Sequence, residues 1–291
     1  MKPKEIVVTS GKGGTGKTTL TSSLAAYLGN VTLCDADVDA PDLYILLKPS
    51  IKANYKFWGI DTAQVDSSKC IGCSRCFKTC RFDSITMIND KAIVDTNFCE
   101  GCAACAYVCP TNAISMVPTE QGTYYESTTN YGPMWHAQLF PGGENSGKLV
   151  QILRNRAKET ALKEKIPYVI IDGPPGVACP AISSITGCDL TVAVTEPSVS
   201  ALSDLKRLTE VAKRFSVPMG IVINKSDIAP KVTDLIKEEC QKEGLTVIGE
   251  IPFSEDIPKA ISRREIPLEE TKPNIEKIWK TILHNLTSSP I

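Results

Sequence analysis

The stretch Gly11-Lys12-Gly13-Gly14-Thr15-Gly16-Lys17-Thr18 decides the fold of this chain. Its glycine, followed five positions later by Gly-Lys-Thr, has the spacing of a loop that binds phosphates. Residues 5–10 form an apolar, β-branched run that predicts a strand, and the spacing of apolar residues over 18–28 predicts a helix. A strand, a glycine-rich loop and a helix in this order can surround phosphates with backbone N–H groups and the positive end of the helix. We therefore predict an α/β domain that binds a nucleotide.

Two side chains at the end of the loop carry the expected chemistry. Lys17 is expected to meet the β- and γ-phosphate oxygens, and Thr18 is expected to bind Mg²⁺. The glycines allow the backbone to approach the phosphates closely. The cofactors that this loop predicts are ATP and Mg²⁺.

The chain repeats the strand and helix pattern on both sides of a cysteine-rich segment. Helical patterns separate the later strands at the spacing of βαβ units. The sequence thus predicts a doubly wound, mostly parallel sheet. Further buried strands are expected at residues 31–34, 168–171, 190–194, 219–223 and 245–248.

Eight of the twelve cysteines fall in two runs with the same spacing, C-x₂-C-x₂-C-x₃-C. This is the spacing of bacterial ferredoxins, in which the fourth cysteine of each run binds the other cluster. A zinc site is the alternative, but zinc sites use two pairs of ligands. We predict two [4Fe-4S] clusters, one held by Cys70, Cys73, Cys76 and Cys109 and the other by Cys99, Cys102, Cys105 and Cys80.

The cysteine-rich segment is internally duplicated. Residues 70–76 match residues 99–105, and similar sequences follow each run. After the last cysteine, Arg81 stands where proline is usual, whereas the second run is followed by Pro110, so the first run has the more positive surroundings. We predict an α+β ferredoxin-like domain at residues 62–118, inserted into an ATPase domain that comprises residues 1–61 and 119–291. Within the latter, 118–148 is expected to be a β-excursion and loop.

Composition excludes several classes of partner. The 291 residues have a formal net charge of -1 and a pI near 6.2, so no general basic field attracts nucleic acid or an acidic membrane. The sequence has neither the pattern of a secretory signal peptide nor a run of about 20 apolar residues that would span a membrane. We expect a protein of the reducing cytoplasm, with no nucleic-acid partner and no stable membrane association.

Lys12 is an unusual second lysine within the loop, and with it the chain resembles the ParA/MinD family, which includes the nitrogenase iron protein. The resemblance implies a SIMIBI-type P-loop fold and a dimer, formed with an identical or a homologous ATPase subunit. In that family the extra lysine reaches the nucleotide of the facing subunit, so Lys12 is expected to couple ATP binding to dimerisation.

Other family motifs follow in the same order. Residues 34–42 are similar to the switch I segment, in which Asp37 would orient the attacking water and Asp35 or Asp39 would lie near Mg²⁺. Residues 168–176 resemble a Walker B strand and switch II. The resemblance thus implies catalytic roles for Lys12, Lys17 and Asp37, and nucleotide binding by Gly11, Lys12, Gly13, Gly14, Thr15, Gly16, Lys17, Thr18, Thr19, Asp172, Gly176, Asn224 and Pro252.

Three features outside these motifs allow more than one reading. Cys34, Cys188 and Cys240 are interpreted as small buried hydrophobic residues. Cys179 follows Asp172 at the interval of a cluster ligand in the nitrogenase iron protein, so it is either a bridging ligand or an interface thiol. The apolar stripe of the last helix is expected to dock on the core rather than on a membrane.

The function predicted from these features is a dimeric ATPase switch coupled to two [4Fe-4S] clusters, which transfers electrons to a redox or metalloprotein acceptor under the control of ATP. The alternative is a metal-cluster assembly or carrier ATPase of the Mrp type. Such carriers typically use a Cys-x-x-Cys pair in their C-terminal half, and this chain has none there. A ParA-like positioning protein that acts on DNA or membrane is disfavoured by the near-neutral charge. The identity of the acceptor and the choice between homodimer and heterodimer stay open.

Overall fold

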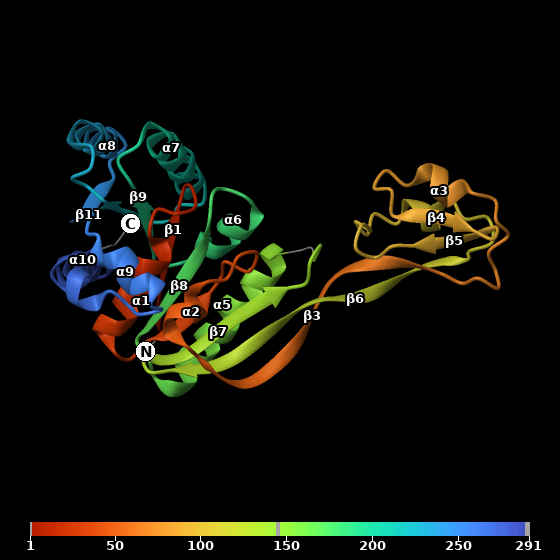
Figure 1. The fold of residues 1–291 in the computed structure, drawn as a ribbon, viewed down its shortest axis with the longest axis horizontal. Coiled ribbons are helices and arrows are strands. Elements are labelled where there is room, and N and C mark those ends of the chain that lie inside the picture. Colours follow the sequence, from red (N-terminus) through yellow and green to blue (C-terminus); the bar gives the residue numbers. More distant parts are fainter. Residues whose placement is uncertain (1, 144–145, 289–291) are drawn as a thin grey trace.

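The computed structural model describes residues 2–143 and 146–288. It consists of an α/β body and a small cysteine lobe, which are joined by a long two-stranded ribbon (Figure 1). Positions 1 and 291, the two ends of the predicted ATPase domain, lie outside the described residues, as do residues 144–145 of the predicted excursion and loop.

The body is built on one nine-stranded sheet with the order β11-β10-β9-β1-β8-β2-β7-β6-β3. Neighbouring strands from β11 to β7 are parallel, and β6 and β3 are antiparallel to their neighbours. This confirms the prediction of an α/β fold with a mostly parallel sheet. The strands are β1 Lys4–Ser10, β2 Thr32–Asp35, β3 Ser50–Val65, β6 Ile114–Thr129, β7 Gly132–Leu139, β8 Tyr168–Pro175, β9 Leu190–Thr195, β10 Met219–Asn224 and β11 Thr246–Ile251.

Helices cover both faces of the sheet, because its parallel strands are apolar on both sides. Helices α1, α2 and α10 pack on one face of the sheet, and α5, α7 and α8 pack on the other. The helices of the body are α1 Lys17–Leu28, α2 Leu43–Leu47, α5 Ser146–Glu164, α6 Cys179–Ile185, α7 Val199–Arg214, α8 Pro230–Lys242, α9 Asp256–Ser262 and α10 Leu268–Ser288.

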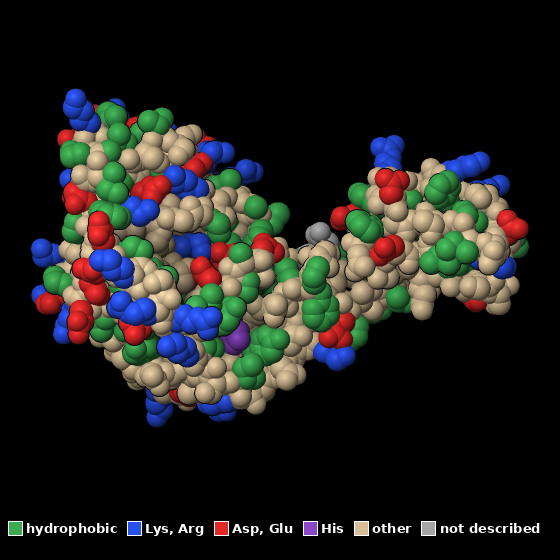
Figure 2. Space-filling model, viewed as in Figure 1, with side chains coloured by type: hydrophobic (Ala, Val, Ile, Leu, Met, Phe, Trp, Pro, Cys, Tyr) green, Lys and Arg blue, Asp and Glu red, His purple; other side chains and the backbone are tan. Residues whose placement is uncertain are grey.

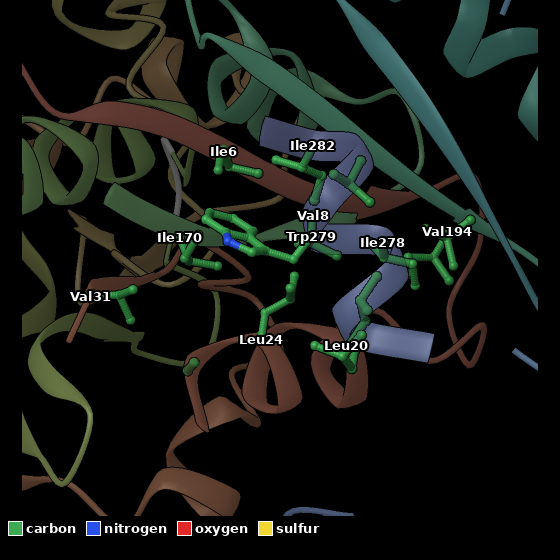
Figure 3. Close-up of a cluster of buried hydrophobic side chains, with 14 of the residues drawn as sticks. Ile6, Val8, Leu20, Leu24, Val31, Ile170, Val194, Ile278, Trp279 and Ile282 are labelled. Atoms are coloured by element: carbon green, nitrogen blue, oxygen red, sulfur yellow. The ribbon is translucent and has the colours of Figure 1, made fainter. Parts of the chain in front are cut away.

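The apolar stripe of α10 docks on the body. Ile275, Ile278 and Ile282 are fully buried, and Trp279 packs edge-on against Tyr168 of β8. Figure 3 shows Ile278, Trp279 and Ile282 among side chains of β1, α1 and β8. The prediction of docking is therefore confirmed. Among the described residues, no helix combines the length and the apolar character that a membrane span requires.

The ribbon is an extension of the last two strands of the sheet. Only the second half of β6, from Gly122 onward, pairs with β7, while its first half pairs with β3 alone. Irregular pairing occurs around Trp58, between the body and the free part of the ribbon. The expected domain boundaries fall inside these strands, where Asp61 pairs with Pro118.

The cysteine lobe contains the short helices and the hairpin that lie between the two ribbon strands. These elements are α3 Arg75–Thr79, β4 Ile85–Ile88, β5 Lys91–Val94 and α4 Ala104–Tyr107. The duplicated runs adopt the same backbone geometry: φ is +70° at Gly72 and +64° at Gly101, and +60° at both Ser74 and Ala103. The repeat in the sequence is thus a repeat in local structure.

Candidate functional site

The glycine loop joins β1 to α1 and ends in a residue that must be glycine. Gly16 precedes α1 with a φ of +95°, and a Cβ atom there would lie 2.4 Å from the side-chain nitrogen of Asn224. That amide donates a hydrogen bond of 2.8 Å to the carbonyl oxygen of Thr15. Asn224, at the end of β10, thereby holds the loop at its turn into the helix.

Lys17 and the predicted catalytic aspartate meet directly. The Lys17 Nζ lies 2.7 Å from Asp37 Oδ2, and both side chains are almost completely buried. Burial by itself lowers the pKa of Lys17, but the nearby carboxylates of Asp172 and Asp37 outweigh it and raise that pKa above its ordinary value. The lysine therefore stays charged and is available to phosphate oxygens if it leaves Asp37.

Asp172, within β8, accepts hydrogen bonds from hydroxyl groups of α1. Its carboxylate accepts hydrogen bonds from Thr18 at 2.7 Å and from Thr21 at 2.9 Å. The same Thr18 hydroxyl oxygen lies 2.9 Å from Asp42 Oδ1. Burial raises the pKa of Asp172 to about 6, against the opposing effect of Lys17. Burial, followed by Asp172, also raises the pKa of Asp35. This group of acids and hydroxyls can supply oxygen ligands to a hard divalent cation.

Lys12 folds back onto its own subunit. Its Nζ lies 2.8 Å from Glu196 Oε1, and it also contacts the hydroxyl groups of Ser198 and Ser200 at 3.3 Å. Glu196 receives Lys225 on its other oxygen, at 2.8 Å. Any contact of Lys12 with a facing subunit would therefore require this pair to open.

A cavity of about 280 Å³ lies beside the loop, and its lining is mostly apolar. It brings Gly14, Gly16, Thr19, Asn224 and Pro252 together, all of which were predicted to bind the nucleotide. Further lining residues come from β11, the loop that follows it, α9 and α10: Ile251, Phe253, Ile257, Pro258, Ile261, Thr271 and Ile275. Their apolar faces suit a nucleotide base.

Two further glycines of the loop, Gly11 and Gly13, do not line this cavity. Gly11 packs against Asp204 of α7, and Gly13 has open space around its Cα. The N–H of Gly176, in the predicted switch II, donates a hydrogen bond of 2.8 Å to the carbonyl oxygen of Ser10. Contact between that N–H and a γ-phosphate would thus require a local rearrangement.

The eight cysteines of the lobe line two separate cavities. Cys70, Cys73, Cys76 and Cys109 line the first, and Cys80, Cys99, Cys102 and Cys105 line the second. The fourth cysteine of each run lies with the first three of the other run. Within residues 2–143 and 146–288, no three or more His, Cys, Asp or Glu side chains form a group that could hold a single metal ion.

The other four cysteines differ in exposure. Cys34, Cys188 and Cys240 are buried, as predicted, and burial raises the pKa of Cys188 and of Cys240 to about 11. Cys179 is exposed at the start of α6. Its assignment as a bridging ligand or an interface thiol stays a prediction.

Three acidic residues of the site were missed from the sequence or were given no partner. Glu196 bridges Lys12 and Lys225, Asp42 binds the Thr18 hydroxyl, and Asp204 packs on Gly11. Glu196 and Asp204 belong to the connection after β9 and to α7, far from the loop in sequence. Their position at the carboxyl edge of a parallel sheet is the only signal that could have indicated them.

These features define a nucleotide-binding α/β protein with a phosphate-binding loop at the carboxyl edge of a parallel sheet. Residues 6–268 match the family model described as the CobQ/CobB/MinD/ParA nucleotide binding domain. The chain belongs to this family.

Individual relatives agree with this assignment. An uncharacterized protein of Methanocaldococcus jannaschii is 35% identical over 263 residues, which cover 89% of this chain and 88% of that protein. The septum site-determining protein MinD of Thermotoga maritima is 26% identical over 268 residues, or 87% of this chain and 76% of that protein. The fold is similar to that of MinD from Pyrococcus horikoshii complexed with Mg-ADP, with a TM-score of 0.55, 18% identity and coverage of 96% of both chains.

Proposed function

We propose that this chain is a Mg²⁺-dependent ATPase of the MinD/ParA type that dimerises over ATP, and that two [4Fe-4S] clusters in its lobe exchange electrons with a redox or metalloprotein partner under the control of ATP. One observation carries the proposal. The eight cysteines gather as two sets of four, at the end of a ribbon that extends from the edge of the sheet that carries the glycine loop. We retain residues 62–118 as a ferredoxin-like unit between the ATPase segments 1–61 and 119–291.

The surroundings of the cysteine sulfurs fit bound clusters. The backbone N–H of Ala113 donates to Cys109 Sγ at 3.2 Å, and that of Ala63 donates to Cys99 Sγ at 3.5 Å. Hydrogen bonds from the backbone, above all from Ala92, lower the pKa of Cys70 and favour its thiolate. In a [4Fe-4S] cluster each thiolate binds a different iron, so four sulfurs need not converge on one point as they do around a single ion. When bound, such clusters supply one-electron redox chemistry.

The contacts at the nucleotide site describe the resting arrangement of a switch. Lys17 would exchange Asp37 for a nucleotide phosphate, and the Thr18 hydroxyl would exchange Asp172 for Mg²⁺. Once Lys17 has moved to the phosphates, Asp37 is free to orient a water molecule for attack. Binding of MgATP thus changes the contacts of the segments after β2 and at the start of α1.

Dimerisation would involve a similar exchange of partners at Lys12. The side chain of Glu196 is about one-fifth exposed and is shared with Lys225, so it keeps a cationic partner when Lys12 leaves. We expect Lys12 to exchange this contact for the phosphates of the facing subunit.

Two connections link the nucleotide site to the ribbon. Asp42, which binds Thr18, immediately precedes α2, and β3 begins shortly after that helix at Ser50. On the other side, the α5 residue Lys148 donates a hydrogen bond of 3.0 Å to the carbonyl oxygen of Trp58 in the ribbon. The neighbouring Gly147 packs on α6, which follows switch II. Movement of either switch can therefore reach the ribbon through direct contacts.

The first test is an anaerobic analysis of iron and sulfide, followed by electron paramagnetic resonance of the reduced protein with ATP, ADP or no nucleotide. The proposal predicts about eight irons per chain by cubane stoichiometry, and a signal or a rate of oxidation that depends on nucleotide. A single zinc in place of iron would contradict the cluster assignment.

The cluster-carrier alternative is favoured by one observation, the exposure of Cys73 and Cys102, through which a cluster would be accessible to another protein. The same preparation distinguishes the two functions. Iron and sulfide that leave for an added apo-protein in an ATP-dependent manner indicate a carrier. Iron that stays bound while electrons leave indicates an electron donor.

A further inference from the structure

The two halves of the cysteine lobe share their backbone geometry but differ in surface chemistry. When Cys70 is aligned with Cys99, positions 75, 78 and 81 hold basic side chains, whereas their counterparts 104, 107 and 110 are uncharged. The equivalent pairs are Arg75 and Ala104, Lys78 and Tyr107, and Arg81 and Pro110. The second half thus shows that the loop and the cysteine geometry do not require these cations.

At three other aligned positions the first half exposes a large apolar side chain that the second half lacks, although Phe98 and Tyr107 of the second half are themselves 62% and 93% exposed. Ile71, Phe77 and Phe82 expose 66%, 50% and 43% of their area, respectively. Their counterparts in the second half are Glu100, Ala106 and Thr111. We call the six residues Ile71, Arg75, Phe77, Lys78, Arg81 and Phe82 the first-loop surface.

The cations of the first-loop surface have no acidic partner within the described part of the chain. The other two basic residues of the lobe are engaged, since Lys69 pairs with Asp66 and Lys91 donates to the carbonyl oxygen of Cys70. Arg75, Lys78 and Arg81 are exposed and form no ion pair among residues 2–143 and 146–288. In Figure 2, basic side chains stand along the edge of the lobe where Figure 1 places α3.

The first-loop surface adjoins both sets of cysteines, since Phe82 lines the cavity of Cys80, Cys99, Cys102 and Cys105. Ile71 and Arg75 line the cavity of Cys70, Cys73, Cys76 and Cys109, and Cys73 is itself exposed. A protein bound there would stand directly beside that cavity. Exposed aromatic side chains interspersed with arginine are the composition that protein interfaces favour.

We propose that the first-loop surface is the docking site for an acidic electron-carrier protein. The proposal rests on the proposed redox function and adds the place and the charge of the partner. Unpaired cations select an acidic partner and accelerate its approach, while the apolar side chains are covered on contact. Because residues 62–118 hold five basic and five acidic side chains, this attraction is local to the first-loop surface.

The test measures binding of an acidic flavodoxin to the anaerobic, iron-loaded full chain, with a basic cytochrome c as the opposite probe. The test variant Arg75→Ala/Lys78→Tyr carries the side chains that the second half already accommodates, so the loop should keep its fold. Lys231→Glu on α8 is the matched control, because it is an exposed charge change on the body. Iron content is measured for each variant.

At low salt we expect flavodoxin to bind the native chain, with the double variant binding about tenfold more weakly, the control within about twofold of native, and binding falling as salt rises. Absence of flavodoxin binding, equal binding by the double variant, or preference for cytochrome c would overturn the docking proposal. The proposal would also be overturned if the double variant lost binding only to single-stranded DNA or only to anionic vesicles, tested in parallel, and bound flavodoxin as the native chain does. If the native chain takes up no iron under anaerobic loading but still binds flavodoxin through Arg75 and Lys78, the docking proposal stands and only the proposed redox function is contradicted.

Discussion

The body and the cysteine lobe are stabilised by different means. The body buries long apolar runs of parallel strands between two layers of helices, so its fold is supported by ordinary packing. The lobe has a small core in which Cys76 and Cys105 lie among a few apolar residues such as Ile85 and Ile114. A lobe of this size needs bound clusters or another cross-link to be stable. A substitution that disrupts one part should therefore leave the structure and the ligand binding of the other part intact.

The largest effect is expected from the cysteines. Cys109→Ala removes the ligand that reaches from the second run to the first cavity, so about half of the iron should be lost. MgATP affinity should stay within twofold of native, because Cys109 does not contact the body. Iron analysis and nucleotide titration check the two statements. Full retention of iron would contradict the assignment of Cys109 as a ligand.

The converse change is Lys17→Met in the body. It removes the cation that pairs with Asp37, and loss of its contact with phosphate should weaken MgATP binding by about 3 kcal/mol, or roughly 100-fold. Iron content should be unchanged. Calorimetric titration measures the affinity, and a variant that binds MgATP as the native chain does would refute the role of Lys17.

Lys12→Ala separates dimerisation from nucleotide binding. Lys12 contacts Glu196 and two serine hydroxyls, and the phosphates of its own subunit are the expected partners of Lys17, so binding of ATP to a single subunit should be affected by less than about threefold. Dimer formation with ATP, measured by light scattering, should be lost. Dimers that form normally would show that Lys12 does not act across the interface.

Lys148→Met tests the connection between the two parts. Its methylene chain keeps its packing, while the hydrogen bond to Trp58 and the contact of the ammonium group with the Phe57 ring are removed. ATPase activity and iron content should stay as in the native chain, but the effect of ATP on the cluster signal should fall severalfold. Lys163→Met, on the exposed side of the same helix, is the control and should leave that effect unchanged.

The smallest effect concerns pH and the base of the ribbon. Burial lowers the pKa of His136 to about 4, and its Nε2 lies 2.9 Å from the Ser127 hydroxyl. The unfolded chain binds the proton near pH 6.5, so the stability associated with neutral His136 is complete above that pH and is lost as pH falls toward 4. Between pH 7 and pH 5, the free energy of unfolding of the native chain should fall by about 2 kcal/mol more than that of His136→Gln. Parallel stability profiles of the two proteins would contradict the buried, neutral imidazole.

The sequence predicted the body better than the connection between its parts. The strand, loop and helix around Lys17, and the later β-branched runs, were located correctly because their apolar patterns are local. The ribbon was not foreseen, although apolar and polar residues alternate over 51–57 and that local signal for a strand was missed. The alternation does not tell how far the strand extends, because most of β3 is exposed or half-buried. The contact of Lys12 with Glu196 was also missed, since it depends on which loops meet at the edge of the sheet.

The measurement that tests the central proposal most directly is a redox titration of the iron-loaded chain, followed by electron paramagnetic resonance, with ATP and with no nucleotide. If the nucleotide site controls the lobe, ATP should shift the potential or the line shape of at least one cluster, and Lys17→Met should abolish the shift. Clusters whose potentials and spectra are identical with and without ATP would contradict the proposal that the two parts of the molecule work together.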